Sequence, residues 1–185
     1  MTTTTDRAYT LRRLHEPSDA ELGALADVLV DCVEGGASVS FMHPFGRERA
    51  LAFWVRIASD VRHGKRALIV AEDDAGICGT VQLLLDVPEN QPHRAELVKM
   101  LVHRRARRRG LGAALMRAAE STALECGRTL LVLDTVSESA GERLYTRLGW
   151  QRVGVVPRYA LMPDGEFCDA TFFYKDLVAA GTPSG

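Results

Sequence analysis

The chain has 185 residues, of which 46% are hydrophobic, and this is enough for one globular domain with a buried core. Its 23 Lys and Arg residues nearly balance 24 Asp and Glu residues, so the formal net charge is -1. The isoelectric point of about 6.5 lies well below the value above ~9 that is usual for dedicated nucleic-acid-binding domains. We therefore expect no nucleic-acid partner.

The cysteine and histidine residues lack the spacing of redox pairs and metal sites. Cys32, Cys78, Cys126 and Cys168 lie more than forty residues apart, so no C-x-x-C pair is present. The five histidines form no H-E-x-x-H motif, and we expect no metal site. The sequence shows neither an apolar run of membrane-spanning length nor the apolar core of a signal peptide. These features favour a cytoplasmic protein with reduced thiols and no membrane partner.

One strand and two helices are predicted in the first third of the chain. An edge strand is expected over YTLRRL, residues 9–14, followed by a helix with Ser18 as N-cap and Glu21 completing a capping box. This helix should end at the glycine pair of the segment GGASVSFMHPFG, residues 35–46, which has the composition of a loop that lines a pocket or packs on the core. A second helix is predicted over 47–62.

Three neighbouring antiparallel strands are predicted next. They are RALIVAED, residues 66–73, ICGTVQLLLDV, residues 77–87, and RAELVKMLV, residues 94–102. A turn at DDAG and a proline-bounded loop at PENQP separate them, so the pattern indicates a meander.

The segment VHRRARRRGLGAALM, residues 102–116, combines an arginine run with two glycines. We expect the preceding strand to run directly into Gly110, where a helix begins that ends at Gly127. The start of a helix presents unpaired N–H groups at the positive end of its dipole, and glycines there let a phosphate approach the backbone. The pattern R-x-x-G-x-G from Arg107 to Gly112 matches neither the Walker motif nor the dinucleotide-binding motif. A phosphate-containing ligand is therefore expected without nucleotide hydrolysis or hydride transfer.

The last part of the chain is predicted to hold three strands and one helix. The apolar run TLLVLDT, residues 129–135, is expected to be a strand that is covered on both faces. A short helix in ESAGERLYTRLGW ends at Gly149, and strands over 151–156 and 167–175 flank the turn-rich MPDGEF. The domain should therefore span residues 9–177, between a flexible leader, residues 1–8, and a flexible tail, residues 178–185.

This sequence resembles the GNAT superfamily of acyl-CoA-dependent N-acetyltransferases. Its R-x-x-G-x-G loop is similar to the family's pyrophosphate loop, and ERLYTRLGW resembles the later LY-x-x-x-G-F/W signature. Shorter matches, HRAELVKMLV, RGLG, LLVLDT and PDG, resemble the tabtoxin-resistance acetyltransferase branch. The resemblance implies an α/β fold with a mixed, mostly antiparallel sheet of six to seven strands, helices on both faces, and central strands that splay apart to hold CoA.

The same resemblance implies a set of cofactor contacts. Backbone groups near Met100 and Val102 would pair with the pantetheine arm, amides from Arg108 to Ala113 would hold the pyrophosphate, and Arg107 would lie where that loop begins. Glu138 stands where many members have asparagine, so Ser137 or Ser139 would make that hydrogen bond to pantetheine, or it would be absent. The residues expected to contact acetyl-CoA are Met100, Leu101, Val102, Arg107, Arg108, Arg109, Gly110, Leu111, Gly112, Ala113, Ser137, Ser139 and Arg143.

Catalytic roles also follow from the resemblance, and each has a plainer alternative. The reaction would be direct attack by an amine through a tetrahedral intermediate, with Tyr145 as the general acid and Glu96 as the base. Tyr145 could instead be a packed aromatic residue, and Glu96 only a salt-bridge partner. Arg104 and Arg105 are expected to be solvated or to lie near the 3′-phosphate of the cofactor.

The identity of the acceptor is the least determined feature. The resemblance implies a small primary amine, amino-acid-like or an antibiotic, while a peptide N-terminus or a polyamine stays open. The residues expected to contact the acceptor are Phe41, Trp54, Asp134 and Tyr159, with Asp134 holding its ammonium group. A homodimer is compatible with this interpretation, and a non-catalytic acyl-CoA-binding or interaction domain is the alternative function.

Overall fold

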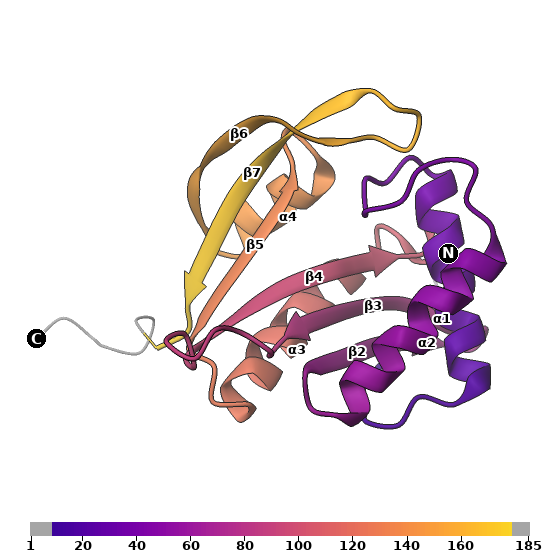
Figure 1. Ribbon diagram of the computed structural model, residues 1–185, viewed down its shortest axis with the longest axis horizontal. Helices are drawn as coiled ribbons and strands as arrows, with labels where there is room; N and C mark the ends of the chain where they lie inside the picture. The colour runs from indigo at the N-terminus through magenta and orange to yellow at the C-terminus, as the bar shows by residue number, and fades with distance from the viewer. Residues whose placement is uncertain (1–8, 179–185) are drawn as a thin grey trace, which may run out of the picture.

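The computed structural model describes residues 9–178 of the chain. The predicted leader, residues 1–8, and residues 179–185 of the predicted tail lie outside the described residues. The described chain forms one seven-stranded sheet in the order β1-β2-β3-β4-β5-β7-β6 (Figure 1). Its elements are β1 (Thr10–Leu14), α1 (Asp19–Glu34), α2 (Arg47–Arg62), β2 (Arg66–Asp73), β3 (Gly76–Leu84), β4 (Arg94–Val102), a 3-10 turn (Arg104–Ala106), α3 (Leu111–Glu125), β5 (Leu130–Val136), α4 (Ala140–Arg147), β6 (Gln151–Leu161) and β7 (Phe167–Asp176).

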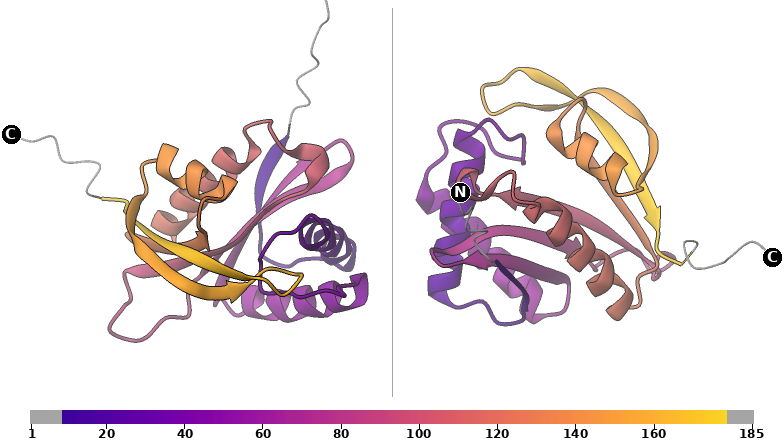
Figure 2. Two further views of the ribbon diagram at one scale, coloured as in Figure 1. Left: turned by 90° about the horizontal axis from the view of Figure 1, so that it is seen from above. Right: turned by 180° about the vertical axis from the view of Figure 1, so that it is seen from behind.

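The sheet is mixed and mostly antiparallel, as predicted. Strands β1 to β4 form a meander, β4 and β5 form the one parallel pair, and β7 pairs antiparallel with both β5 and β6. Helices α1 and α2 cover one face, while α3 and α4 cover the other (Figure 2). The predicted capping box at Ser18 is confirmed, with Glu21 N–H donating to Ser18 Oγ and Ser18 N–H to the Glu21 carboxylate.

The two central strands separate soon after they begin. Strands β4 and β5 pair only from Arg94 to Glu96, which face Leu130 to Val132. Beyond these residues the two strands diverge (Figure 1). The side of β4 that faces β5 therefore has no partner strand from Leu97 onward, so backbone groups on this side can pair with a ligand, except the Val102 carbonyl, which accepts from Arg107. This confirms the predicted splay.

A bulge in β4 lies beside the point of divergence. The register with β3 shifts between the pairs Leu101↔Thr80 and Val98↔Gln82, which leaves Lys99 and Met100 outside the regular ladder. Lys99 adopts a positive φ of 52°. Because a bulge re-aims side chains that would otherwise alternate between faces, it determines where the following residues point.

The predictions for three segments were wrong in detail. Strand β5 buries only Leu131 and Leu133 fully, because one of its faces borders the opening between β4 and β5 instead of a helix. The arginine run does not pass directly from strand to helix. A 3-10 turn over Arg104–Ala106 separates β4 from α3, and α3 begins at Leu111. The last hairpin is longer than predicted, since β6 continues to Leu161.

Candidate active site

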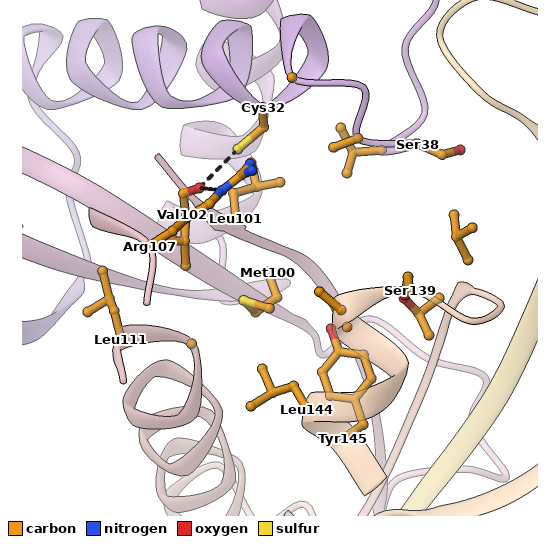
Figure 3. A pocket seen from close by; sticks show the side chains of 18 of the residues that line it. Cys32, Ser38, Met100, Leu101, Val102, Arg107, Leu111, Ser139, Leu144 and Tyr145 are labelled. Atoms are coloured by element: carbon orange, nitrogen blue, oxygen red, sulfur yellow. Dashed lines mark hydrogen bonds between the residues drawn. The ribbon is translucent and has the colours of Figure 1, made fainter. Parts of the chain in front are cut away.

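A large cavity lies where β4 separates from β5. Its volume is about 790 Å³, and the segments that enclose it are the open side of β4, the starts of α3 and α4, and the loop after α1. Figure 3 shows Met100 and Val102 on one side of this cavity and Leu144 and Tyr145 of α4 on the other. Of the predicted cofactor contacts, Met100, Leu101, Val102, Arg107, Arg108, Gly110, Leu111, Gly112, Ala113 and Ser139 line it.

The start of α3 opens into this cavity without a side-chain cap. Gly110 is the N-cap residue with φ +74°, a left-handed conformation that glycine adopts without strain, and it makes no capping hydrogen bond. The first N–H groups of an α-helix have no acceptor within the helix. At α1 the side chain of Ser18 accepts one of these hydrogen bonds. The start of α3 therefore has the geometry of an anion site, with the helix dipole adding attraction for negative charge.

The arginine run divides between structural and cavity-lining residues. Arg104 donates from its backbone N–H and from Nε to Asp31, both at 2.8 Å. Arg105 donates to both carboxylate oxygens of Asp73, which Arg109 also contacts at 3.5 Å. These contacts tie the loop to α1 and to the end of β2, so they correct the expectation that Arg104 and Arg105 are merely solvated. The remaining arginines, Arg107 and Arg108, line the cavity.

Arg107 also forms a hydrogen bond with the Val102 carbonyl, a backbone group that was expected to bind the cofactor. Its Nε donates to the Val102 carbonyl at 3.1 Å, and the Cys32 thiol lies 3.6 Å from the same oxygen (Figure 3). Burial raises the pKa of the Cys32 thiol. Pairing of a ligand with this carbonyl would therefore compete with Arg107, whereas Met100 lies outside the β3 ladder and faces the opening.

Glycine at position 112 allows close packing in addition to the predicted contact with the cofactor. A Cβ atom at this position would lie 3.1 Å from Cδ2 of Leu144 and 3.9 Å from Cε of Met100. The glycine therefore permits α3 and α4 to approach each other at the cavity wall. Any longer side chain would extend into the space beside the helix start.

Tyr145 lies where this cavity meets a second one. The residue is only 5% exposed, with its ring 6.1 Å from that of Trp150 and 6.0 Å from that of Phe173. Its hydroxyl group points toward Met100 (Figure 3). No group within residues 9–178 forms a hydrogen bond with this hydroxyl. Burial, together with the nearby Asp134, raises the pKa of Tyr145 above its ordinary value, so the phenol stays protonated at neutral pH.

The second cavity has a volume of about 540 Å³ and contains most of the predicted acceptor contacts. Glu96, Phe41, Asp134 and Tyr159 all line it, although they come from four different segments of the chain. Burial raises the pKa of Asp134, and Lys99 acts in the opposite direction. Glu96 is half-buried at the last paired position of β4. Tyr145 and Met100 line both cavities, so they form the passage between them.

The structure also places Lys99 in the second cavity, a residue to which the sequence analysis assigned no role. Its Nζ donates to Ser40 Oγ at 2.9 Å. Burial lowers the pKa of Lys99, the positive charge of Arg66 acts in the same direction, and Asp134 and Glu96 oppose them. The only signal in the sequence was a lysine within the mostly apolar second half of this strand, Leu97–Val102.

Four predicted contacts lie elsewhere. Trp54 is 0% exposed in the core between α1, α2 and the sheet, so it cannot touch an acceptor, and that prediction was wrong. Ser137, Arg143 and Arg109 do not line the larger cavity. The Ser137 hydroxyl lies 2.8 Å from that of Thr171, within hydrogen-bond distance. The side chain of Arg143 donates to the Glu138 carbonyl, and that of Arg109 contacts Asp73. Ser139 lines it but also caps α4, because it accepts from Glu142 N–H at 3.1 Å.

The described residues contain neither a metal-binding cluster nor a membrane-spanning helix. Among residues 9–178, no cluster of three or more His, Cys, Asp or Glu side chains is arranged to hold a metal ion. Within the same residues, no helix has both the length and the apolar character needed to cross a membrane.

Comparison with known proteins identifies the fold. Residues 64–152 match the family model described as an acetyltransferase (GNAT) domain. An acetyltransferase structure from Salmonella typhimurium, described with its cofactor acetyl-CoA, shares 20% identity with a TM-score of 0.75 over 96% of this chain and 99% of that one. A ribosomal-protein-alanine N-acetyltransferase from Brucella melitensis shares 22% identity, with a TM-score of 0.74 over 90% and 99% of the two chains. An acetyltransferase of the GNAT family from Streptococcus pneumoniae shares 21% identity with a TM-score of 0.70, and the match covers 91% of this chain and 99% of that one. The chain therefore has the fold of GNAT acetyltransferases.

Proposed function

We propose that this protein is a GNAT-family N-acetyltransferase that moves an acetyl group from acetyl-CoA to a primary amine of a small molecule. The observation that carries this proposal is the position of Tyr145. Its hydroxyl has no hydrogen-bond partner within residues 9–178, and the residue lines both a cavity suited to CoA and a cavity lined by carboxylates. A hydroxyl on a rigidly packed ring that lines a cavity and has no protein partner is available to a ligand.

The larger cavity fits the chemistry of CoA. The uncapped start of α3 and the side chains of Arg107 and Arg108 provide N–H donors and positive charge for a pyrophosphate. The unpaired side of β4 near Met100 provides backbone groups for the amide-rich pantetheine arm. Acetyl-CoA would contribute the activated acetyl thioester, and the remaining steps depend on groups of this chain.

Residues around the passage are suited to the steps of acyl transfer. Met100 lies outside the ladder with β3 and lines both cavities, so its backbone N–H would donate to the thioester carbonyl and stabilise the negative charge on that oxygen. Tyr145 is the proton donor for the departing sulfur. At its ordinary pKa of about 10 a phenol is already a weaker acid than a thiol, whose reference pKa is about 8.5, and burial of Tyr145 widens this difference. The proton is therefore transferred only as negative charge builds on the sulfur while the C–S bond breaks.

The second cavity provides the groups that an amine requires. Glu96 is placed to accept the proton that the amine loses, directly or through water. Asp134 lies in the same cavity and attracts an ammonium group before that proton is lost. A volume of about 540 Å³ is in the range of small-molecule sites, roughly 300–1,000 Å³. This supports a small acceptor such as an amino acid or an antibiotic.

The proposal extends to three finer points. The motifs around β4 and MPDGEF support the tabtoxin-resistance branch, and the dispersed free thiols support a cytoplasmic location. The edge strand β6 exposes Val153, Val155 and Val156 to 67%, 40% and 42%, which supports a homodimer formed along this edge. Light scattering coupled to gel filtration would show a mass near 20 kDa for a monomer and twice that for the dimer.

A screen for thiol release tests the main proposal. Purified protein is incubated with acetyl-CoA and a panel of amino acids, amino-acid amides, aminoglycosides, polyamines and peptides, and free CoA is detected with a thiol reagent. We expect release above the hydrolytic background with at least one small amine, and a mass increase of one acetyl group on that amine. If CoA raises the melting temperature but no amine is acetylated, the result supports a non-catalytic CoA-binding domain instead.

A further inference from the structure

Lys99 is the one basic residue that lines the acceptor cavity within the described chain, and the proposed function leaves it without a role. Its Nζ donates to Ser40 Oγ at 2.9 Å. No carboxylate of residues 9–178 lies within 4.0 Å of this ammonium group. A lysine ammonium group carries three N–H donors, so two of them remain for a ligand in the cavity.

The backbone of β4 holds Lys99 in this position. The bulge removes Lys99 and Met100 from the ladder with β3, and Lys99 has a φ of 52°. A lysine in the left-handed region is strained, and such strain persists only where the surrounding structure enforces it, most often at active sites and ligand clamps. Ser40, its partner, also has a positive φ, of 77°. Both residues of this hydrogen-bonded pair, which line the same cavity, therefore have positive φ angles.

A cation at this place is unfavourable for an acceptor that carries only positive charge. Glu96 and Asp134 in the same cavity attract an ammonium group, whereas Lys99 repels it. Burial already disfavours the charged form of Lys99 and lowers its pKa. An anionic group on the acceptor would reverse both effects, because it would pair with the ammonium of Lys99 while the acceptor amine stays near the carboxylates.

We propose that Lys99 and Ser40 bind a carboxylate of the acceptor, so the acceptor is an amino acid or a closely similar zwitterion. The inference rests on the proposed acetyl transfer and deepens it. Ser40 Oγ accepts a hydrogen bond from Lys99 and can donate its own O–H to the same carboxylate. The carboxylate then lies against the loop after α1, and the amine points toward Glu96 and the passage at Tyr145.

Matched pairs of amino acids and their primary amides test the inference. The two members of a pair share the side chain and the amine and differ only in the carboxylate, and kcat/KM is measured for both. Amino-acid amides have the lower amine pKa, so without an anion site the amide is the better acceptor at neutral pH. We expect wild-type protein to prefer the acid. In Lys99→Met the ratio of acid to amide should fall by about 10- to 100-fold, mainly through KM of the acid.

Two other variants separate binding from general damage. Ser40→Ala removes one donor and should lower the same ratio by about 3- to 10-fold. Lys65→Met is the matched control, because Lys65 is 54% exposed and pairs with Asp86 at 3.3 Å outside both cavities. Its ratio should stay within twofold of wild type. Lys99→Met should still show the rise in melting temperature with CoA, which demonstrates a folded protein with an intact cofactor cavity.

The possible outcomes distinguish this inference from the proposed function. If the ratio of acid to amide is the same in wild type and Lys99→Met, or if wild type acetylates amides and no acid, the carboxylate site is wrong and the acetyltransferase proposal stands. If wild type acetylates neither acids nor amides nor any other amine, both proposals are overturned. A preference for acids that Lys99→Met abolishes supports both.

Discussion

Arg105 and Asp73 form an ion pair that joins the loop before α3 to the end of β2. Nη1 of Arg105 lies 2.6 and 2.5 Å from the two carboxylate oxygens, and the Asp73 side chain is only 1% exposed. The hydrogen bond from Arg105 holds the pKa of Asp73 below its ordinary value. A carboxylate from another part of the chain, that of Asp73, therefore anchors the basic segment that suggested a phosphate site.

We predict that Asp73→Asn lowers the free energy of unfolding by about 1–3 kcal/mol, since it removes the charge from a buried hydrogen-bonded pair. Because the folded pKa of Asp73 is depressed, its contribution is present above the unfolded value near 3.9 and disappears as pH falls through the folded value. Urea denaturation at pH 7 and at pH 3 measures both effects. The matched control is Asp27→Asn, whose exposed pair with Arg47 should contribute less to the free energy of unfolding than the Asp73 pair does. Equal effects of the two substitutions at pH 7 would contradict this assignment.

The arginine run shows which features of the site can be predicted from the sequence and which cannot. The pattern R-x-x-G-x-G and the helical spacing after Gly110 were sufficient to place a helix start and an anion site, because both depend on neighbouring residues. The sequence could not show that Arg104 and Arg105 are paired, since Asp31 and Asp73 lie 73 and 32 residues away. Contacts of that separation depend on the packed fold.

A second prediction concerns the cofactor cavity. Gly112→Glu should abolish the rise in melting temperature that saturating CoA causes, because the carboxylate would lie beside the uncapped start of α3 and repel a pyrophosphate. Binding at a hundredfold excess over Kd should stabilise wild type by about 2.7 kcal/mol. Gly154→Glu adds the same charge on β6, where a Cβ meets no atom within 4 Å, and should retain the shift. A wild-type melting curve that CoA leaves unmoved would show that the cofactor assignment is wrong.

The pH dependence of the reaction follows from the groups in the passage. Burial raises the pKa of Tyr145 above 10, so its proton is retained throughout the usual assay range. Because the acceptor amine must lose its proton, kcat/KM should rise with pH from 6 to 9 and should not decline before about pH 10. A profile of initial rates with one accepted amine checks this. A decline with a midpoint near pH 8 would indicate that the essential acid is a different group.

Acceptor recognition was predicted less completely than the fold. Phe41, Asp134 and Tyr159 line one cavity, because they lie in a loop, at the end of β5 and on a late strand that the predicted element order brings together. Their contact with an acceptor stays a prediction. Trp54 was misplaced because aromatic character alone does not distinguish a core position from a pocket wall. Lys99 was missed because its direction is determined by a bulge, and the pairing that creates a bulge is not visible in one strand.

The most direct test of the account is the chemical step in Tyr145→Phe, measured by single-turnover transfer of acetyl from acetyl-CoA to an accepted amine. The hydroxyl has no protein partner within residues 9–178, so its removal should leave stability and CoA affinity nearly unchanged. We expect the rate of transfer to fall by about 10²–10⁴-fold, equivalent to roughly 3–5 kcal/mol in the transition state. A folded Tyr145→Phe protein that transfers acetyl within about threefold of the wild-type single-turnover rate would contradict the role of Tyr145 as proton donor.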